Sequence, residues 1–138
     1  MNNLINKILL IVLSITIIYG CNNNESNNYM LVSGKIDGLR KGKLYLQQFV
    51  DSVFVSIDST VVNNEFEFNL GTEIIEPDIY YLYLDKVDGD SVNDRIKFFG
   101  DTGEITINSR LITFDTNAEI SGSKNQALME EYLSLIHI

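Results

Sequence analysis

Cysteine and histidine carry much of the metal, redox and nucleophilic chemistry of proteins, and this 138-residue sequence has one of each, Cys21 and His137. One Cys and one His cannot form a zinc site of Cys and His ligands, an internal disulfide or a Cys-x-x-Cys redox pair. His137 is the penultimate residue, where chains fray, and the sequence has no Gly-x-Ser-x-Gly nucleophile motif. We therefore predict that the chain as given is not an enzyme and has no catalytic residues, no metal site and no cofactor.

Carboxylates are the next candidates for chemistry. The segment from Asp85 to Asp94 gathers oxygen ligands around a glycine, as calcium loops do, but its spacing does not fit the EF-hand template. We interpret this segment as a solvated loop between two strands. Glu65 and Glu67 alternate with phenylalanines, which is typical of the solvent face of a strand rather than of the paired carboxylates of a glycoside hydrolase.

Two tyrosines are the candidate ligand-binding residues. Side chains alternate between faces along the aromatic run from Ile79 to Leu84, so Tyr81 and Tyr83 share a face opposite Tyr80. Exposed tyrosines on a sheet can stack on sugar rings, because each offers an apolar ring and a hydroxyl group. A strand buried on both faces, or one packed against a C-terminal helix, would have the same pattern, so both interpretations stay open.

The residues before Cys21 assign it a different chemistry. A largely apolar run of 11 residues, 8–18, is shorter than the roughly 20 residues that span a bilayer. The sequence Ile18-Tyr19-Gly20-Cys21 is similar to the lipobox of bacterial lipoproteins, which implies cleavage before Cys21 and attachment of lipid to its thiol. Residues 1–20 are therefore predicted to be a lipoprotein signal peptide.

An Asn-rich tether, residues 21–28, follows this predicted leader. A flexible chain of this length has a typical reach of roughly 15 Å. We expect the lipid on Cys21 to hold the protein on a membrane of the bacterial cell envelope, facing the periplasm or on the outer membrane. The formal net charge of −9 excludes nucleic acid as a partner and would repel anionic headgroups, so the lipid must do the anchoring.

The body of the chain, residues 29–122, is predicted to be mainly β, an antiparallel β-sandwich or partly open barrel. Its apolar residues repeat with a period of two between short turn signals, and no helical pattern separates the strands. We expect three sets of residues each to share one face of a strand: Leu44 with Leu46; Val53 with Val55 and Ile57, opposite Phe54, Ser56 and Asp58; and Phe66 with Phe68 and Leu70.

The final segment, residues 123–138, changes to a helical period. Ser123 followed by Gln126 is a capping-box pattern, which predicts the start of a C-terminal helix. Its apolar residues are expected on one helical face: Leu128, Tyr132 and Leu135. Because the sequence ends on apolar residues without a helix C-cap, we expect this helix to begin a missing linker or domain.

A series of turns and aromatic strands runs through the body in a fixed order. Its members are Gly34, Gly38-Leu39, Gly42, Leu44-Tyr45-Leu46, Ile57 to Val61, Asn64 to Phe68, Pro77, Tyr80, Phe98-Phe99, Gly103, Ile105 and Ile120 to Ser123. Over about residues 30 to 125, this pattern resembles the domain of unknown function at the front of many lipid-anchored, thioredoxin-like thiol:disulfide oxidoreductases of the bacterial envelope. The resemblance implies a β-rich domain that leads through helices into a thioredoxin fold. It carries over no active-site residue, because none of the catalytic motif is present.

These observations predict a lipid-anchored, non-catalytic accessory domain, the N-terminal part of a truncated thioredoxin-like oxidoreductase, which would space, dock or dimerise the redox domain. Its expected partners are the membrane, through the lipid on Cys21, and a downstream thioredoxin-like domain or a homodimer partner. The alternative is a complete small envelope lipoprotein that binds a glycan or peptide through Tyr81 and Tyr83.

Overall fold

The computed structural model describes residues 1, 3–5, 28–64, 67–86, 94–123 and 125–136. Cys21, most of the predicted signal peptide and most of the predicted tether lie outside the described residues, as do Glu65, Phe66 and His137. The predictions made for those residues therefore stay predictions.

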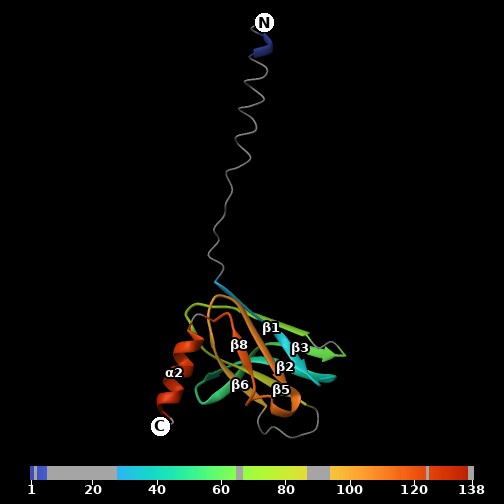
Figure 1. Cartoon of the computed structure of the whole chain (residues 1–138), viewed down its shortest axis with the longest axis vertical. Helices are drawn as coiled ribbons and strands as arrows, with labels where there is room; N and C mark the ends of the chain where they lie inside the picture. The colour runs from blue at the N-terminus through green and yellow to red at the C-terminus, as the bar shows by residue number, and fades with distance from the viewer. Residues whose placement is uncertain (2, 6–27, 65–66, 87–93, 124, 137–138) are drawn as a thin grey trace.

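The described body consists of strands followed by one α-helix (Figure 1). Its elements are β1 (Tyr29–Asp37), β2 (Lys41–Val50), β3 (Val53–Asn63), β4 (Glu67–Glu73), β5 (Asp78–Asp85), β6 (Arg95–Gly100), β7 (Gly103–Arg110), a 3₁₀ turn (Leu111–Thr113), β8 (Glu119–Ser121) and α2 (Gln126–Ile136). Within the described ranges, no helix is both long and apolar enough to cross a membrane.

The strands form two four-stranded sheets that pack face to face as an open sandwich. Sheet A has the order β4-β1-β7-β8, and sheet B has the order β3-β2-β5-β6. The chain passes from one sheet to the other several times, so each sheet contains strands that are distant in sequence. The prediction of a mainly β sandwich with one C-terminal helix is confirmed.

One strand pair departs from the antiparallel expectation. β1 and β7 run parallel along eight residue pairs, from Met30 opposite Gly103 to Asp37 opposite Arg110. A parallel pair needs a long crossover, which is usually a helix. Here the crossover consists of β2 to β6, most of which belong to the other sheet. The lack of helical segments therefore did not exclude a parallel pair, and the structure corrects that expectation.

The hydrophobic core lies between the inner faces of the two sheets. Leu44 and Leu46 from β2 are fully buried, and Phe68 and Leu70 from β4 are nearly so, which confirms the alternation expected for those residues. The other core side chains with 0–2 % exposure are Met30, Val32, Ile36, Leu39, Leu82, Leu84, Ile96, Phe98, Ile105, Ile107 and Phe114. Each such side chain contributes about 1.5–3 kcal/mol relative to an exposed position.

A β-bulge in β3 changes the faces expected for that strand. The register with β2 shifts between Leu46, which pairs with Asp58, and Gln47, which pairs with Ser56. Because paired residues point to the same face, Asp58 lies on the inner face with Leu46, while Ser56 lies on the outer face with Gln47. The expectation that Ser56 and Asp58 share a face is wrong, because the extra residue of a bulge reverses the alternation.

Helix α2 begins at Gln126, within the segment predicted to be helical, but Ser123 and Gln126 do not form the predicted capping box. The Gln126 side chain instead accepts a 2.9 Å hydrogen bond from the Phe99 N–H of β6 and donates one of 3.1 Å to Glu130. Ser123 Oγ is buried without a hydrogen-bond partner among the described residues. The N–H at the edge of β6 needs a partner, and Gln126 supplies it in place of capping its own helix.

Candidate functional site

The outer face of sheet B carries a connected row of aromatic and cationic side chains. Tyr45 of β2 stands opposite Tyr83 of β5, and Tyr83 stands opposite Arg95 of β6. Because paired residues share a face, these three side chains lie side by side across the sheet. Phe54 of β3 joins the same face through its pairing with Phe49 of β2, with the two ring centroids 4.9 Å apart.

Arg95 is the residue that holds this aromatic row together. Its guanidinium carbon lies 4.3 Å from the ring centroid of Phe54 and 4.3 Å from that of Tyr83. Its Nε donates a 3.3 Å hydrogen bond to Oε1 of Gln47, a residue only 6 % exposed, and Gln47 Nε2 in turn donates to Ser56 Oγ at 3.1 Å. A half-buried guanidinium between two rings gains cation–π attraction and holds both rings in place.

The predicted ligand-binding tyrosines both belong to this face, and both are half-buried. Tyr83 lies between Arg95 and the stacked ring of Tyr45, whose centroid is 5.8 Å away at an interplanar angle of 29°. Tyr81 packs edge to face against Phe54, with centroids 5.0 Å apart. Arg95 and Tyr45 thus occupy much of the Tyr83 ring surface on which a sugar would stack, whereas Tyr81 has one edge-to-face contact, with Phe54.

Sequence reasoning found the two tyrosines but missed Arg95, Phe54 and Gln47. Arg95 is the first residue of β6, which pairs with β5. This pairing places Arg95 opposite Tyr83. That register could not be read from the sequence, because the segment between β5 and β6 would allow the two strands to pair in several registers.

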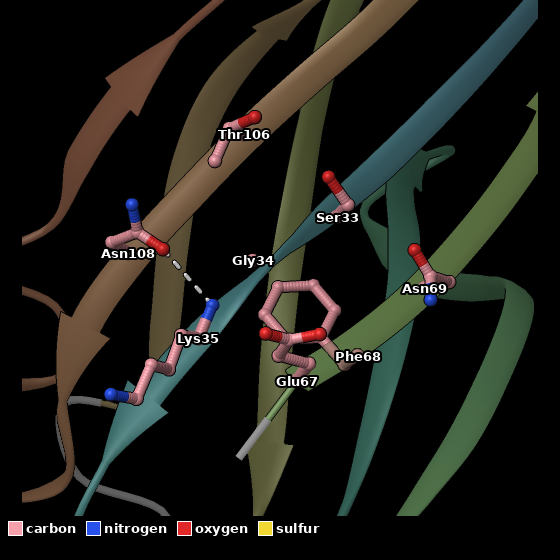
Figure 2. Close-up of a pocket in the computed structure, with 8 residues that line it drawn as sticks. All are labelled: Ser33, Gly34, Lys35, Glu67, Phe68, Asn69, Thr106 and Asn108. Carbon is pink, nitrogen blue, oxygen red and sulfur yellow. Dashed lines mark hydrogen bonds between the residues drawn. The ribbon is translucent and has the colours of Figure 1, made fainter.

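A second candidate surface is a polar hollow on the outer face of sheet A, with a volume of about 320 Å³. Figure 2 shows it among β1, β4 and β7, with Gly34 at its centre. Hydroxyl, amide and carboxylate groups line it, from Ser33, Glu67, Asn69, Thr106 and Asn108. Asn108 Oδ1 accepts a 3.0 Å hydrogen bond from the Lys35 N–H, drawn as a dashed line in Figure 2. This hollow can exchange hydrogen bonds with a small polar ligand.

The loop considered for calcium is described only at its ends, since residues 87–93 lie outside the described residues. Asp94 is 2 % exposed, and its carboxylate forms an ion pair with the ammonium group of Lys86. A lysine charge therefore sits beside this carboxylate, where a bound cation would be repelled. Among the described residues, no three His, Cys, Asp or Glu side chains lie close enough together to hold a metal ion.

Comparison with known proteins identifies the family of the chain. The family model described as "Domain of unknown function (DUF4369)" matches residues 30–129. The chain belongs to this family. The match begins in β1 and ends within α2, so the DUF4369 domain contains both sheets and the first turn of the helix. No curated protein and no solved structure matches the chain. A function for this DUF4369 domain must therefore be argued from its own residues.

Proposed function

We propose that this DUF4369 domain is a lipid-anchored, non-catalytic accessory domain at the front of a thioredoxin-like thiol:disulfide oxidoreductase of the bacterial envelope. The lipid on Cys21 fixes the domain to a membrane, the Asn-rich tether spaces it from the surface, and helix α2 docks the redox domain. The proposal combines the resemblance of the sequence to such front domains with one feature of the helix.

The observation that carries the proposal is the exposed apolar stripe of α2. Leu128, Tyr132, Leu135 and Ile136 are 63 %, 64 %, 62 % and 56 % exposed, although three of them share the helical face that a core would cover. The helix is attached to the sandwich through the buried Gln126 near its first turn, and it lies at the periphery of the molecule (Figure 1). An amphipathic helix whose apolar stripe does not face its own core is suited to pack against a neighbouring domain.

The anchoring half of the proposal rests on the sequence Ile18-Tyr19-Gly20-Cys21. Attached acyl chains gain about 0.8 kcal/mol per buried CH₂ group, so several chains on one cysteine hold a protein firmly on a bilayer. An exported protein with a single free thiol would also be open to stray disulfide exchange, which lipidation of Cys21 prevents.

Mass spectrometry of the exported protein tests the anchor. We expect the mature chain to begin at a lipid-modified Cys21, and a Cys21→Ser variant to keep its leader and carry no lipid. A mature product with an unmodified Cys21, or a wild-type chain that retains its leader, would contradict the anchoring half of the proposal.

The DNA that follows the codon for Ile138 in the intact gene tests the oxidoreductase half. We expect an open reading frame with a Trp-Cys-x-x-Cys motif within about one domain length. A stop codon directly after Ile138 would contradict it. In the longer protein, Tyr132→Asp should separate the two domains in a limited-proteolysis assay, whereas Glu131→Gln, also exposed on α2, should leave cleavage unchanged.

The alternative, a lipoprotein that binds a glycan or peptide through Tyr81 and Tyr83, has less support because Arg95 and Tyr45 already pack against the Tyr83 ring. A glycan array separates the two functions. Binding that disappears in a Tyr81→Ala, Tyr83→Ala variant would favour the alternative, and the absence of binding would favour the accessory domain.

A further inference from the structure

Strand β3 is a long edge strand, and part of its edge is open. It forms one end of sheet B and pairs with β2 alone among the described strands. The opposite end of the sheet, β6, has the N–H of Phe99 covered by Gln126 from α2. For residues 53–57 of β3, the described part of the chain provides no such partner.

The bulge separates two parts of β3: the part after it is hydrogen-bonded to the other sheet, and the part before it has an open edge. After the bulge, Oδ2 of Asp58 accepts a 2.9 Å hydrogen bond from the Gly71 N–H, which fastens the second half of β3 to β4 of the other sheet. Before the bulge, residues 53–57 follow the β2–β3 turn at Asp51 and Ser52, and both faces of this part of the strand are exposed. We call residues 53–57 the open edge of β3.

The side chains of the open edge are apolar on both faces. Val53 and Val55 are 56 % and 45 % exposed on the inner face, Phe54 is 40 % exposed on the outer face, and Ile57 at the bulge is 38 % exposed. Natural proteins protect edge strands with charged residues, proline or a covering segment, because unpaired backbone groups recruit other strands. The open edge contains neither a charged residue nor a proline.

We propose that the open edge of β3 binds the same edge of a second copy of this chain, antiparallel about a twofold axis at Val55. The two copies of sheet B then form one continuous sheet across the axis. In this register Val55 faces its own copy, Val53 faces Ile57, and Phe54 faces Ser56. This inference does not depend on the proposed function, because it requires only the sandwich and its edge.

Charge is the reason for choosing a second copy as the partner. The chain has a formal net charge of −9, so two copies repel each other wherever their carboxylates approach. The stretch from Ser52 to Ile57 has no charge, and pairing centred on Val55 places Asp51 opposite Ser59 and Asp58 opposite Ser52. No carboxylate then faces another carboxylate across the new ladder. The segment can thus pair with a copy of itself without charge repulsion and with its apolar side chains facing each other.

The expected dimer is weak in solution and is strengthened by salt. A pairing of about five residues buries less than the roughly 1,600 Å² of a standard stable interface. Added salt screens the repulsion between two acidic chains, since the Debye length falls from about 30 Å at 0.01 M to about 10 Å at 0.1 M. An interface held by opposite charges would weaken under the same change.

Cysteine cross-linking of the full chain tests the register. Directly opposed residues of an antiparallel pair have Cα atoms about 4.5–5.5 Å apart, within the range that a disulfide spans. A Val55→Cys variant should therefore form a disulfide-linked dimer under mild oxidation, above the background set by the unmodified chain, which has Cys21. Val61→Cys is the matched control, because Val61 is 66 % exposed on the same strand but would lie roughly 40 Å from its copy.

A charge substitution tests the same edge without relying on a disulfide. Val55→Lys should abolish the cross-linking of full-length chains, whereas Val61→Lys should leave it unchanged. The cross-linker must be short and must not react with amines, so that the new lysine side chains are not themselves cross-linked. Circular dichroism should show both variants folded, since both side chains are exposed. Monomers at every concentration, loss of association in both lysine variants, or a dimer that Val55→Lys leaves intact would each overturn the proposal. A chain that binds only a foreign peptide strand at this edge would appear as a monomer and would also overturn it.

Discussion

Asp58 and Gly71 join the edges of the two sheets. The carboxylate Oδ2 of Asp58, in β3 of sheet B, accepts a 2.9 Å hydrogen bond from the N–H of Gly71, in β4 of sheet A. The other oxygen, Oδ1, accepts a 2.8 Å hydrogen bond from the N–H of Ser59. The bulge makes the contact with Gly71 available, because it turns the Asp58 side chain to the inner face beside Leu46.

This contact predicts that Asp58→Ala lowers the free energy of unfolding by about 1.5–3 kcal/mol, the usual contribution of a hydrogen bond to a charged group. Asp58→Asn keeps one acceptor oxygen and should lose less. Asp37→Ala is the control: it removes an exposed ion pair with Lys35 and should change stability by about 0.5 kcal/mol or less. Urea unfolding of the three variants measures the differences. Equal losses for Asp58→Ala and Asp37→Ala would contradict a structural role for the Asp58 carboxylate.

A second prediction concerns Gly34, where the parallel strands β1 and β7 lie close together, and the free energy of unfolding. A Cβ atom on Gly34 would lie 1.8 Å from the carbonyl oxygen of Ile107, and backbone cannot move aside as a side chain can. Gly34→Ala should therefore push β1 and β7 apart and cost about 3 kcal/mol or more.

Gly42→Ala is the matched control for Gly34→Ala. A Cβ atom on Gly42 would lie 3.2 Å from the ends of the Leu39 and Leu84 side chains, which can shift slightly, and 3.3 Å from the backbone oxygen of Asp85, far less close than the 1.8 Å contact at Gly34. We expect this variant to lose about 1 kcal/mol. Thermal unfolding followed by circular dichroism should show a much larger drop in Tm for Gly34→Ala, and similar drops would show that β1 and β7 are not in close contact there.

Local patterns in the sequence were sufficient to predict the two-layer fold. Leu44 and Leu46 alternate with polar or aromatic residues, and this alternation is a property of one strand alone. The parallel contact of β1 with β7 is a property of two strands separated by most of the chain, and no local pattern contains it. The bulge at Asp58 was also missed, because an extra residue in one strand is defined only by its partner strand.

In the candidate site, too, the features of a single strand could be predicted and those that depend on strand pairing could not. The period of a β-strand was enough to place Tyr81 and Tyr83 on one face, but not to show which side chains pack against them. Arg95 reaches across Tyr83 to Gln47 because of the β5–β6 register. The β2–β3 turn was not identified either. Asp51 and Ser52 both have positive φ, 50° and 68°, without the glycine that usually marks such a turn.

Arg95 predicts a third effect, on the aromatic face of sheet B. Arg95→Lys removes the planar guanidinium that lies between Phe54 and Tyr83. It also leaves Oε1 of the buried Gln47 without this hydrogen-bond donor. We expect a loss of about 1–2 kcal/mol and a sharper effect for Arg95→Ala. Lys43→Ala, which removes an ammonium group 4.8 Å from the Tyr45 ring, should cost about 0.5 kcal/mol. Near-ultraviolet circular dichroism should report loosened tyrosines in the Arg95 variants and not in the Lys43 variant.

Tyr80 predicts how stability depends on pH at the alkaline end. The ring is 4 % exposed and stacks at 6.1 Å on Phe98 in the core. Burial raises the pKa of the Tyr80 hydroxyl above its ordinary value of 10.0, and the carboxylate of Asp78 raises it further. The folded state therefore holds this proton at a pH where the unfolded chain has released it.

The sign of the effect follows from that difference in proton binding. Below about pH 10 both states keep the Tyr80 proton and the hydroxyl has no effect on the pH dependence. Above it the unfolded state binds fewer protons, so the free energy of unfolding falls as pH rises, by at most about 1.4 kcal/mol per pH unit for one group. Tyr80→Phe, which cannot ionise, should remove this part of the decline between pH 9 and 11 in urea unfolding, whereas Tyr132→Phe on the exposed stripe of α2 should keep it. An alkaline decline that is identical in wild type and Tyr80→Phe would mean that the Tyr80 hydroxyl ionises as readily in the folded protein as in the unfolded chain.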